Sequence, residues 1–158
     1  ALNLDPADIG FEGHGLASLE GGPRFFYVPV KTRAALEKSK VLEPYWSEVI
    51  KPMNGVDAAY LYTRGGDGPN AAFRARMYAP TGGIPEDPAT GSATALLAAQ
   101  LLTAEKLADG SHRWQLEQGY EMGRPSDLTL EADVKAGKLT AVRVGGSAVR
   151  MMSGTLEM

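Results

Sequence analysis

The feature that most constrains the fold of this chain is an uncharged, apolar stretch at residues 88–102, in which alanine and leucine dominate. We expect this stretch to form a helix with Asp87 as its N-cap and Pro88 at its first helical position. A helix without a charged face is usually buried on most of its sides. The rest of the chain must therefore surround it with apolar surface, and its small alanine side chains allow other backbone to approach closely.

The segments around this helix show the alternation of apolar and polar residues that is typical of strands. At residues 71–79, Phe73 and Met77 alternate with Arg74 and Arg76, which predicts a strand with one buried face and one polar face. Alternation in the later segments favours antiparallel hairpins. Further strands are expected at 23–30, 58–64, 114–117, 128–134, 139–144 and 147–156, with short helices at 32–40 and 44–51.

These predictions give an α+β fold class, in which a curved, barrel-like antiparallel β-sheet wraps around one central apolar helix. The length of 158 residues is about that of one domain. The sequence contains no internal repeat and no domain boundary, so residues 1–158 are interpreted as a single domain.

Composition excludes several classes of function. The 16 basic and 19 acidic residues give a net charge of −3 with no basic run, so we expect no nucleic-acid partner. No apolar stretch reaches the roughly 20 residues of a membrane-spanning helix, and the first ten residues lack a signal-peptide pattern; we expect a cytoplasmic protein with no membrane partner. The absence of cysteine excludes disulfides and cysteine nucleophiles. With only two histidines, His14 and His112, we expect no metal site.

The residues best suited to chemistry lie at the start of the predicted helix. Thr90, Gly91 and Ser92 would present backbone N–H groups with little side-chain bulk, and the positive end of the helix dipole favours an anion there. A small carboxylate fits such a site, and the hydroxyl of Ser92 offers a further hydrogen bond. Glu86 and Asp87 place carboxylates at its mouth, where one of them can orient a substrate or carry a proton.

A purely structural interpretation of these residues stays open, because Asp-Pro is also a common cap at the start of a helix. Against it, glycine and serine in the first turn lower helix stability, and the flanking Gly82 and Gly83 allow backbone to approach closely. Two interpretations also stay open for Arg124, in the glycine-rich connection 118–126. It can bind a substrate carboxylate or, as we favour, pair with an acidic residue of the chain.

Four stretches of the sequence resemble the phenazine-biosynthesis PhzF-like isomerases, which belong to the diaminopimelate-epimerase fold superfamily. One of them, FFYVPVKTRAAL at 25–36, fits the start of the same lobe as the other three. The hallmark is RMYAPTGGIPEDPATGSATALLAAQLL at 76–102, followed in matching order by QGYEMGRPS at 118–126 and VRVGGSAVRMMSG at 142–154. The resemblance implies two similar lobes, each a curved sheet around a central helix, with the active site in the cleft between them. The chain is similar to the C-terminal lobe alone, because the motif that carries the family's acid/base glutamate is not found in it.

The resemblance also implies roles for individual residues. Asp87 matches the aspartate that orients substrate or relays a proton, and Gly91 and Ser92 match the groups that hold a substrate carboxylate. Four further residues match motif positions with less certain roles: Glu86, Thr90, Gly82 and Gly83. The related epimerases carry a catalytic cysteine near this helix start, so the absence of cysteine fits the PhzF-like branch.

The sequence and the resemblance together predict a cofactor-independent isomerase or epimerase that moves a proton on a small carboxylate-bearing substrate. No metal, nucleotide or flavin is expected as a cofactor. The chain would supply the anion-binding half of an active site between two lobes. An N-terminal lobe, in the same or a separate chain, would supply the general base, and the isolated chain would be inactive. The family often dimerises, so a homodimer is expected. The alternative is a non-catalytic small-anion binding or assembly module that retains the fold.

Overall fold

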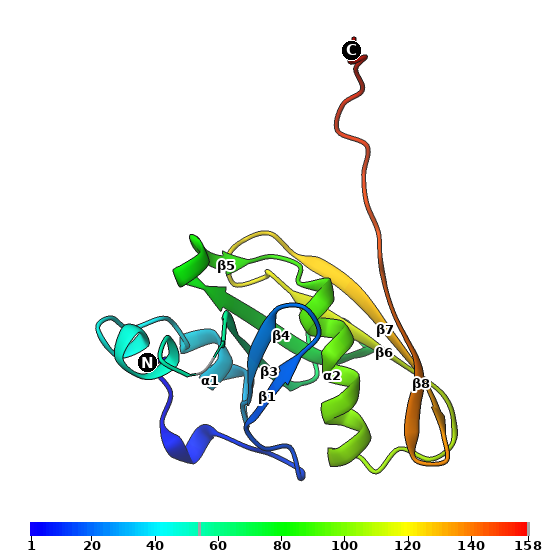
Figure 1. The fold of residues 1–158 in the computed structure, drawn as a ribbon, viewed down its shortest axis with the longest axis horizontal. Coiled ribbons are helices and arrows are strands. Elements are labelled where there is room, and N and C mark those ends of the chain that lie inside the picture. Colours follow the sequence, from blue (N-terminus) through cyan, green and yellow to red (C-terminus); the bar gives the residue numbers. More distant parts are fainter. Residues whose placement is uncertain (54, 158) are drawn as a thin grey trace.

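The apolar helix predicted from the sequence lies against one face of a curved sheet in the computed structural model, which describes residues 1–53 and 55–157 (Figure 1). This helix, α2, spans Gly91–Ala104, and its side chains Ala93, Leu97 and Leu101 are fully buried. Strands approach it from both halves of the chain, which confirms the α+β arrangement of a sheet curved around a central helix. No helix within the described residues has the length and apolar character needed to cross a bilayer.

The sheet contains eight strands, seven of which follow the order β1-β2-β3-β4-β6-β7-β8, while β5 pairs with β4 beside that path. The predicted strands at 58–64 and 71–79 are confirmed with the same bounds. The strands are β1 (Ala17–Glu20), β2 (Arg24–Pro29), β3 (Ala58–Arg64), β4 (Ala71–Ala79), β5 (Ile84–Asp87), β6 (Gly110–Gln118), β7 (Ser126–Lys135) and β8 (Lys138–Gly146).

The prediction of a wholly antiparallel sheet is wrong, because two of the neighbouring pairs, β2–β3 and β4–β6, run parallel and the sheet is mixed. Parallel neighbours need a long crossover connection. Helix α1 (Arg33–Lys38) and the π-helical segment η2 (Trp46–Ile50) lie in the first crossover, and α2 lies in the second. The remaining pairs are antiparallel, as the alternation predicts.

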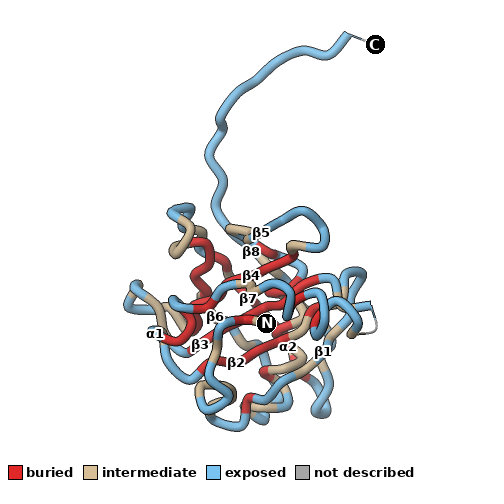
Figure 2. The backbone as a smooth tube through the Cα atoms, turned by 90° about the vertical axis from the view of Figure 1, so that its left-hand side faces the viewer, coloured by how far each residue is buried: buried red, intermediate tan, exposed pale blue. Residues whose placement is uncertain are grey.

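Most of the central strands are buried (Figure 2), and the side chains form two apolar clusters, one on each face of the sheet. One cluster surrounds α2 and includes Tyr27, Tyr60 and Phe73. The other lies under α1 and η2 and includes Leu36 and Trp46. Because the strands are buried on both faces, neither face of the central strands is exposed to solvent.

The prediction of a polar face on β4 is wrong for this reason. Arg74 and Arg76 are only 3 % and 8 % exposed, because they point toward the covered face and are paired with carboxylates. Arg74 donates to Glu117 at 2.5 Å and to Glu121 at 2.8 Å. The arginines that interrupt the apolar pattern are therefore part of the packed structure.

The prediction of a last strand at 147–156 is also wrong. Residues 147–157 carry no regular secondary structure and extend away from the sheet (Figures 1 and 2). Four apolar side chains of this tail are 81–88 % exposed: Val149, Met151, Met152 and Leu156. A strand needs a neighbour to satisfy its backbone, and the described chain places none beside the tail.

Candidate active site at the start of α2

Helix α2 begins three residues later than the sequence predicts. Its N-cap is Thr90, while Asp87 is the last residue of β5 and pairs with Met77 of β4. The prediction of Asp87 as the N-cap is therefore wrong, because pairing with β4 holds this residue in extended backbone. Asp87 stays beside the helix start, since its Oδ2 accepts a 2.7 Å hydrogen bond from the hydroxyl of Thr90.

The helix start is capped by a side chain from a different strand. Thr90 makes no capping hydrogen bond with its own side chain. Instead, its backbone N–H donates to Oε1 of Gln118 at 3.2 Å. The Nε2 of Gln118 donates to the carbonyl of Asp87 at 2.7 Å and to Oγ1 of Thr90 at 2.8 Å. The amide of Gln118 thus binds both sides of the turn that leads into α2.

Sequence analysis missed this role of Gln118. Its position in QGYEMGRPS marks it as the end of a strand, and nothing local shows that strand β6 lies beside the start of α2. A glutamine just before a glycine, in a motif otherwise explained as a turn, is the one signal that points to it. Only the parallel pairing of β4 with β6 brings the two segments together.

Buried tyrosines hold the first turn of α2 from the core side. Tyr27 donates to the carbonyl of Ala93 at 2.5 Å, and the hydroxyls of Tyr60 and Thr94 lie 3.3 Å apart. Thr94 in turn donates to the carbonyl of Thr90 at 2.9 Å. Burial raises the pKa of Tyr60 to about 12 and raises that of Tyr27 further, so both phenols stay neutral. The helix start is therefore fixed on two sides.

A cavity of about 470 Å³ opens beside this fixed helix start. Gly91 lines it, together with Ser126 and Asp127 at the start of β7 and Gly146 and Ser147 at the end of β8. The first N–H groups of a helix have no partner within the helix, and the dipole makes this end positive. The site can therefore bind a small anion.

The predicted site residues are distributed around this helix start. Ser92 is exposed in the first turn of α2, next to Gly91 at the cavity. Glu86 faces elsewhere, because its carboxylate forms a two-pronged ion pair with Arg76 at 2.8 and 2.9 Å. Gly82 and Gly83 are exposed in and beside the short helix η3 (Pro80–Gly82), before β5.

Arg124 is exposed, and within residues 1–53 and 55–157 it forms no ion pair. The ion pair that the sequence favoured is therefore not found. The backbone of Arg124 instead closes the turn after β6, where its N–H donates to the carbonyl of Gly119 at 2.8 Å.

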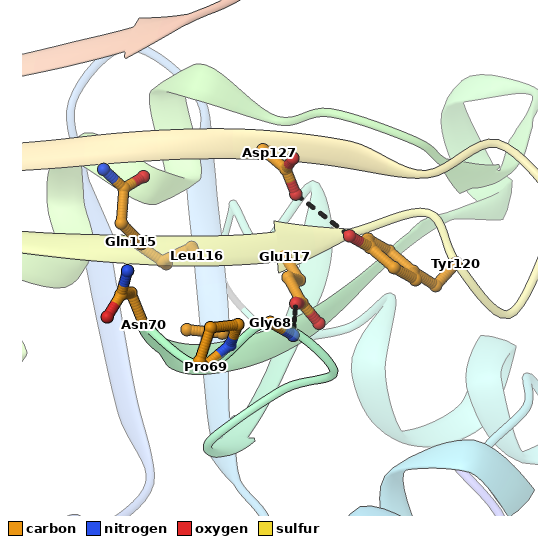
Figure 3. A pocket seen from close by; sticks show the side chains of 9 residues that line it. Gly68, Pro69, Asn70, Gln115, Leu116, Glu117, Tyr120 and Asp127 are labelled. Carbon is orange, nitrogen blue, oxygen red and sulfur yellow. Dashed lines mark hydrogen bonds between the residues drawn. The ribbon is translucent and has the colours of Figure 1, made fainter.

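A second cavity, of about 270 Å³, is lined by residues 68–71 before and at the start of β4 and by residues of β6, β7 and the turn between them (Figure 3). Its main carboxylate, Glu117, accepts hydrogen bonds from the backbone of Asp67 at 2.8 Å and Gly68 at 2.7 Å. Tyr120 donates to Asp127 at 3.0 Å across the same cavity. The strongest polar groups here are bound by the protein itself, so the cavity beside α2 is the better candidate.

Comparison with known proteins agrees with this fold and this motif. Residues 5–154 match the family described as phenazine biosynthesis-like protein, PhzC-PhzF. An uncharacterized isomerase of Mesorhizobium japonicum is 38 % identical over 99 % of the chain and 52 % of its own length. A trans-2,3-dihydro-3-hydroxyanthranilate isomerase of Pseudomonas chlororaphis is 38 % identical over 58 % of the chain and 32 % of its own length.

Solved structures show the same architecture. A phenazine biosynthesis protein of the PhzF family from Bacillus anthracis has a TM-score of 0.76 at 19 % identity, over 94 % of the chain and 53 % of that structure. A predicted epimerase from Pseudomonas aeruginosa has a TM-score of 0.60 at 26 % identity, over 98 % of the chain and 50 % of that structure. The chain thus spans about half the length of the full-length relatives that it matches throughout.

Proposed function

Because the chain belongs to the phenazine biosynthesis-like (PhzC-PhzF) family, we propose that it forms one half of the active site of an isomerase or epimerase. The reaction moves a proton on a small substrate that carries a carboxylate, and the other half of the protein supplies the general base. The observation that carries this proposal is the start of α2, held on two sides and open to a cavity of about 470 Å³.

In this proposal the substrate carboxylate binds at the first turn of α2. The backbone N–H groups of Gly91 and Ser92 donate to it, and the hydroxyl of Ser92 adds a third donor. Each such contact contributes about 0.3–2 kcal/mol from the helix dipole and hydrogen bonding. The Pseudomonas relative supports a carboxylate substrate, because the dihydro-hydroxyanthranilate in its name is a carboxylate.

Asp87 orients the substrate or relays the proton from the mouth of the site. The hydrogen bond from Thr90 fixes the direction of its carboxylate, which supports either role. Thr90 therefore acts on the substrate through Asp87. Glu86 is assigned to holding β5 through Arg76.

The other half, in the same or a separate polypeptide, completes the site. Two observations support this part of the proposal. The matched relatives are about twice as long as the chain. The tail at 147–157 exposes apolar side chains that a partner would cover. Homodimer formation and a cytoplasmic location stay predictions from the sequence.

The anion site is tested by titrating the ¹⁵N-labelled chain with sodium acetate. We expect saturable shifts at the amides of Gly91 and Ser92, and none at Gly137, which lies in the β7–β8 turn far along the chain. The absence of saturable shifts at Gly91 and Ser92 would overturn the site.

The reaction is tested with trans-2,3-dihydro-3-hydroxyanthranilate in D₂O, offered to the chain alone and to a protein that joins it to the other half. We expect deuterium incorporation only from the joined protein. There, Ser92→Ala and Asp87→Asn should each lower kcat/KM about tenfold or more without lowering the Tm. Deuterium incorporation by the chain alone contradicts the shared site, and acetate binding without any turnover favours the anion-binding module.

A further inference from the structure

We propose that Gln118 is a positioning residue that sets the direction of the Asp87 carboxylate through the hydroxyl of Thr90. The inference rests on the proposed function, because Asp87 matters for catalysis only if the start of α2 is the active site. Its structural basis is separate, since it follows from hydrogen bonds between β6 and the turn before α2.

The amide of Gln118 has only one orientation that satisfies its surroundings. The side chain is fully buried, and the amide makes three hydrogen bonds with residues of that turn. The N–H of Thr90 can only donate and the carbonyl of Asp87 can only accept. Rotating the amide by half a turn would therefore set donor against donor and acceptor against acceptor.

This fixed amide decides where the hydroxyl proton of Thr90 points. Oγ1 of Thr90 accepts the 2.8 Å hydrogen bond from Nε2 of Gln118 and has a single proton of its own to donate. Its nearest acceptor is Oδ2 of Asp87, at 2.7 Å. An ionised carboxylate only accepts, so the proton of Thr90 points at Asp87. The donation is charge-assisted, which makes it stronger than a neutral hydrogen bond.

The neighbouring glycine lets Gln118 come this close. Gly119 has a φ of +79°, and a Cβ built on it would lie 2.8 Å from the carbonyl oxygen of Pro88 and 2.9 Å from its Cα. Only a residue without a side chain allows the end of β6 to touch the turn at Pro88. Gln118 therefore binds residues 87–90 through hydrogen bonds, and Gly119 packs directly against their backbone.

Two substitutions of similar size distinguish the role of the acceptor Oε1 of Gln118 from that of its donor Nε2. Gln118→Met removes the acceptor and the donor. Gln118→Glu keeps an acceptor for the N–H of Thr90 and removes the donors to Asp87 and Thr90. We expect Thr90 amide hydrogen exchange to accelerate at least about tenfold in Gln118→Met and to stay slow in Gln118→Glu. The χ1 angle of Asp87, measured by three-bond couplings, is expected to be single in the native chain and averaged in both variants.

A third variant keeps the test decisive if the buried charge of Gln118→Glu prevents folding. Thr90→Val removes the hydroxyl from the other side without adding charge, and we expect the same averaging of Asp87. The matched control is Gln115→Met on the same strand, whose native side chain accepts from Thr129 at 3.0 Å. It should leave both Thr90 exchange and the Asp87 couplings unchanged.

A single Asp87 rotamer in Gln118→Met would overturn the inference, even if the Tm falls, because Gln118 would then be merely structural. In the joined protein we expect Gln118→Met to lower kcat about tenfold with little change in KM, whereas an unchanged kcat would likewise overturn it. Failure of the proposed function shows differently: the native chain would then give no acetate shifts at Gly91 and Ser92, while the couplings of Asp87 would still respond to Gln118.

Discussion

At the scale of the residue, His14 shows how burial changes the chemistry of a side chain that its local sequence places in a loop. Its imidazole is fully buried, with Nδ1 2.9 Å from the hydroxyl of Tyr62 and Nε2 3.6 Å from Glu105. Burial lowers the pKa of His14 below 6.5, and the nearby Arg64 lowers it further, while Glu105 and Glu12 oppose the shift. The neutral form is therefore the one that fits the fold.

The free energy of unfolding should consequently depend on the protonation of His14. The unfolded chain takes up a proton as the pH falls through about 6.5, whereas the folded chain resists it until a lower pH. Stability is thus complete above that pH and declines as the pH falls below it. Denaturant unfolding from about pH 7.5 to about pH 5.5, a window that brackets the ordinary pKa of histidine, measures the decline in the free energy of unfolding.

The second histidine provides the control for this prediction. His112 is only half-buried, and its ring Nε2 donates to the carbonyl of Ala108 at 2.8 Å. We expect His112→Gln to keep the pH dependence and His14→Gln to flatten it, whatever each does to stability at neutral pH. If the free energy of unfolding changes equally with pH in His14→Gln and in the native chain, His14 is not the source of the pH dependence.

Gly119 is constrained by close contacts that the sequence does not reveal. Beside its contacts with Pro88, an added Cβ would overlap the carbonyl oxygen of Arg124, well inside van der Waals contact. We expect Gly119→Ala to lower the free energy of unfolding by about 1–3 kcal/mol or more, because the backbone must move. Gly123→Ala is the matched control, since Gly123 has a similar φ of +72° with open space around it. Equal losses in chemical denaturation would refute the role of close packing.

At the scale of the element, Arg76 joins three pieces of the fold. It binds Glu86 of β5 through two hydrogen bonds, and it donates to three carbonyls at the end of α1, those of Leu36, Glu37 and Ser39. The cluster holds β5 against β4 and so keeps the turn before α2 in place. Burial works against the charge of Arg76, but the bond with Glu86 raises its pKa overall.

Removing one charge from this cluster should loosen β5. We expect Glu86→Gln to lower the free energy of unfolding by about 1.5–3 kcal/mol, the range for hydrogen bonds to charged groups. Glu131→Gln is the control, because its pair with Arg113 is 3.4 Å long and largely exposed, and it should change stability little. Chemical denaturation of both variants measures the difference. If Glu86→Gln lowers the free energy of unfolding no more than the control does, the ion pair of Arg76 with Glu86 does not hold β5 in place.

Elements were predictable from the sequence where their pattern is local. Strands β3 and β4 follow from apolar runs with turn residues at their ends, and Thr32, the first residue of the helix predicted at 32–40, is the N-cap of α1. The start of α2 was not, because its cap comes from Gln118, 28 residues away. Gly91 lies at the start of α2 and lines the cavity there, close to where the sequence predicts the helix start, and its role in anion binding stays a prediction.

At the scale of the whole molecule, the chain folds around its own core but leaves one segment without a partner. The tail at 147–157 has enough apolar residues to suggest a strand, yet a strand also needs a neighbour, which the sequence of the tail does not encode. The fold class was predictable because it follows from patterns within each segment. The conformation of the tail was not, because it depends on a neighbouring strand.

We expect the tail to stabilise the joined protein and not the isolated chain. The double variant Met151→Ser, Met152→Ser should leave the Tm of the chain unchanged, because both side chains are more than 80 % exposed. In the joined protein the same changes should lower the Tm by several degrees, since burying each methionine contributes about 1.5–3 kcal/mol. Thermal unfolding of both forms tests this. A fall in the Tm of the isolated chain would show that the tail packs on the sheet.

The distance along the chain between Thr90 and Gln118 has a consequence for biosynthesis. A ribosome synthesises the apolar helix before it makes residue 118, whose side-chain amide caps that helix. Nascent chains that end before residue 118 consequently hold an alanine-leucine segment with an unsecured first turn. The start of α2 therefore gains its cap only after residue 118 has been made, and translation products truncated before that residue lack the cap.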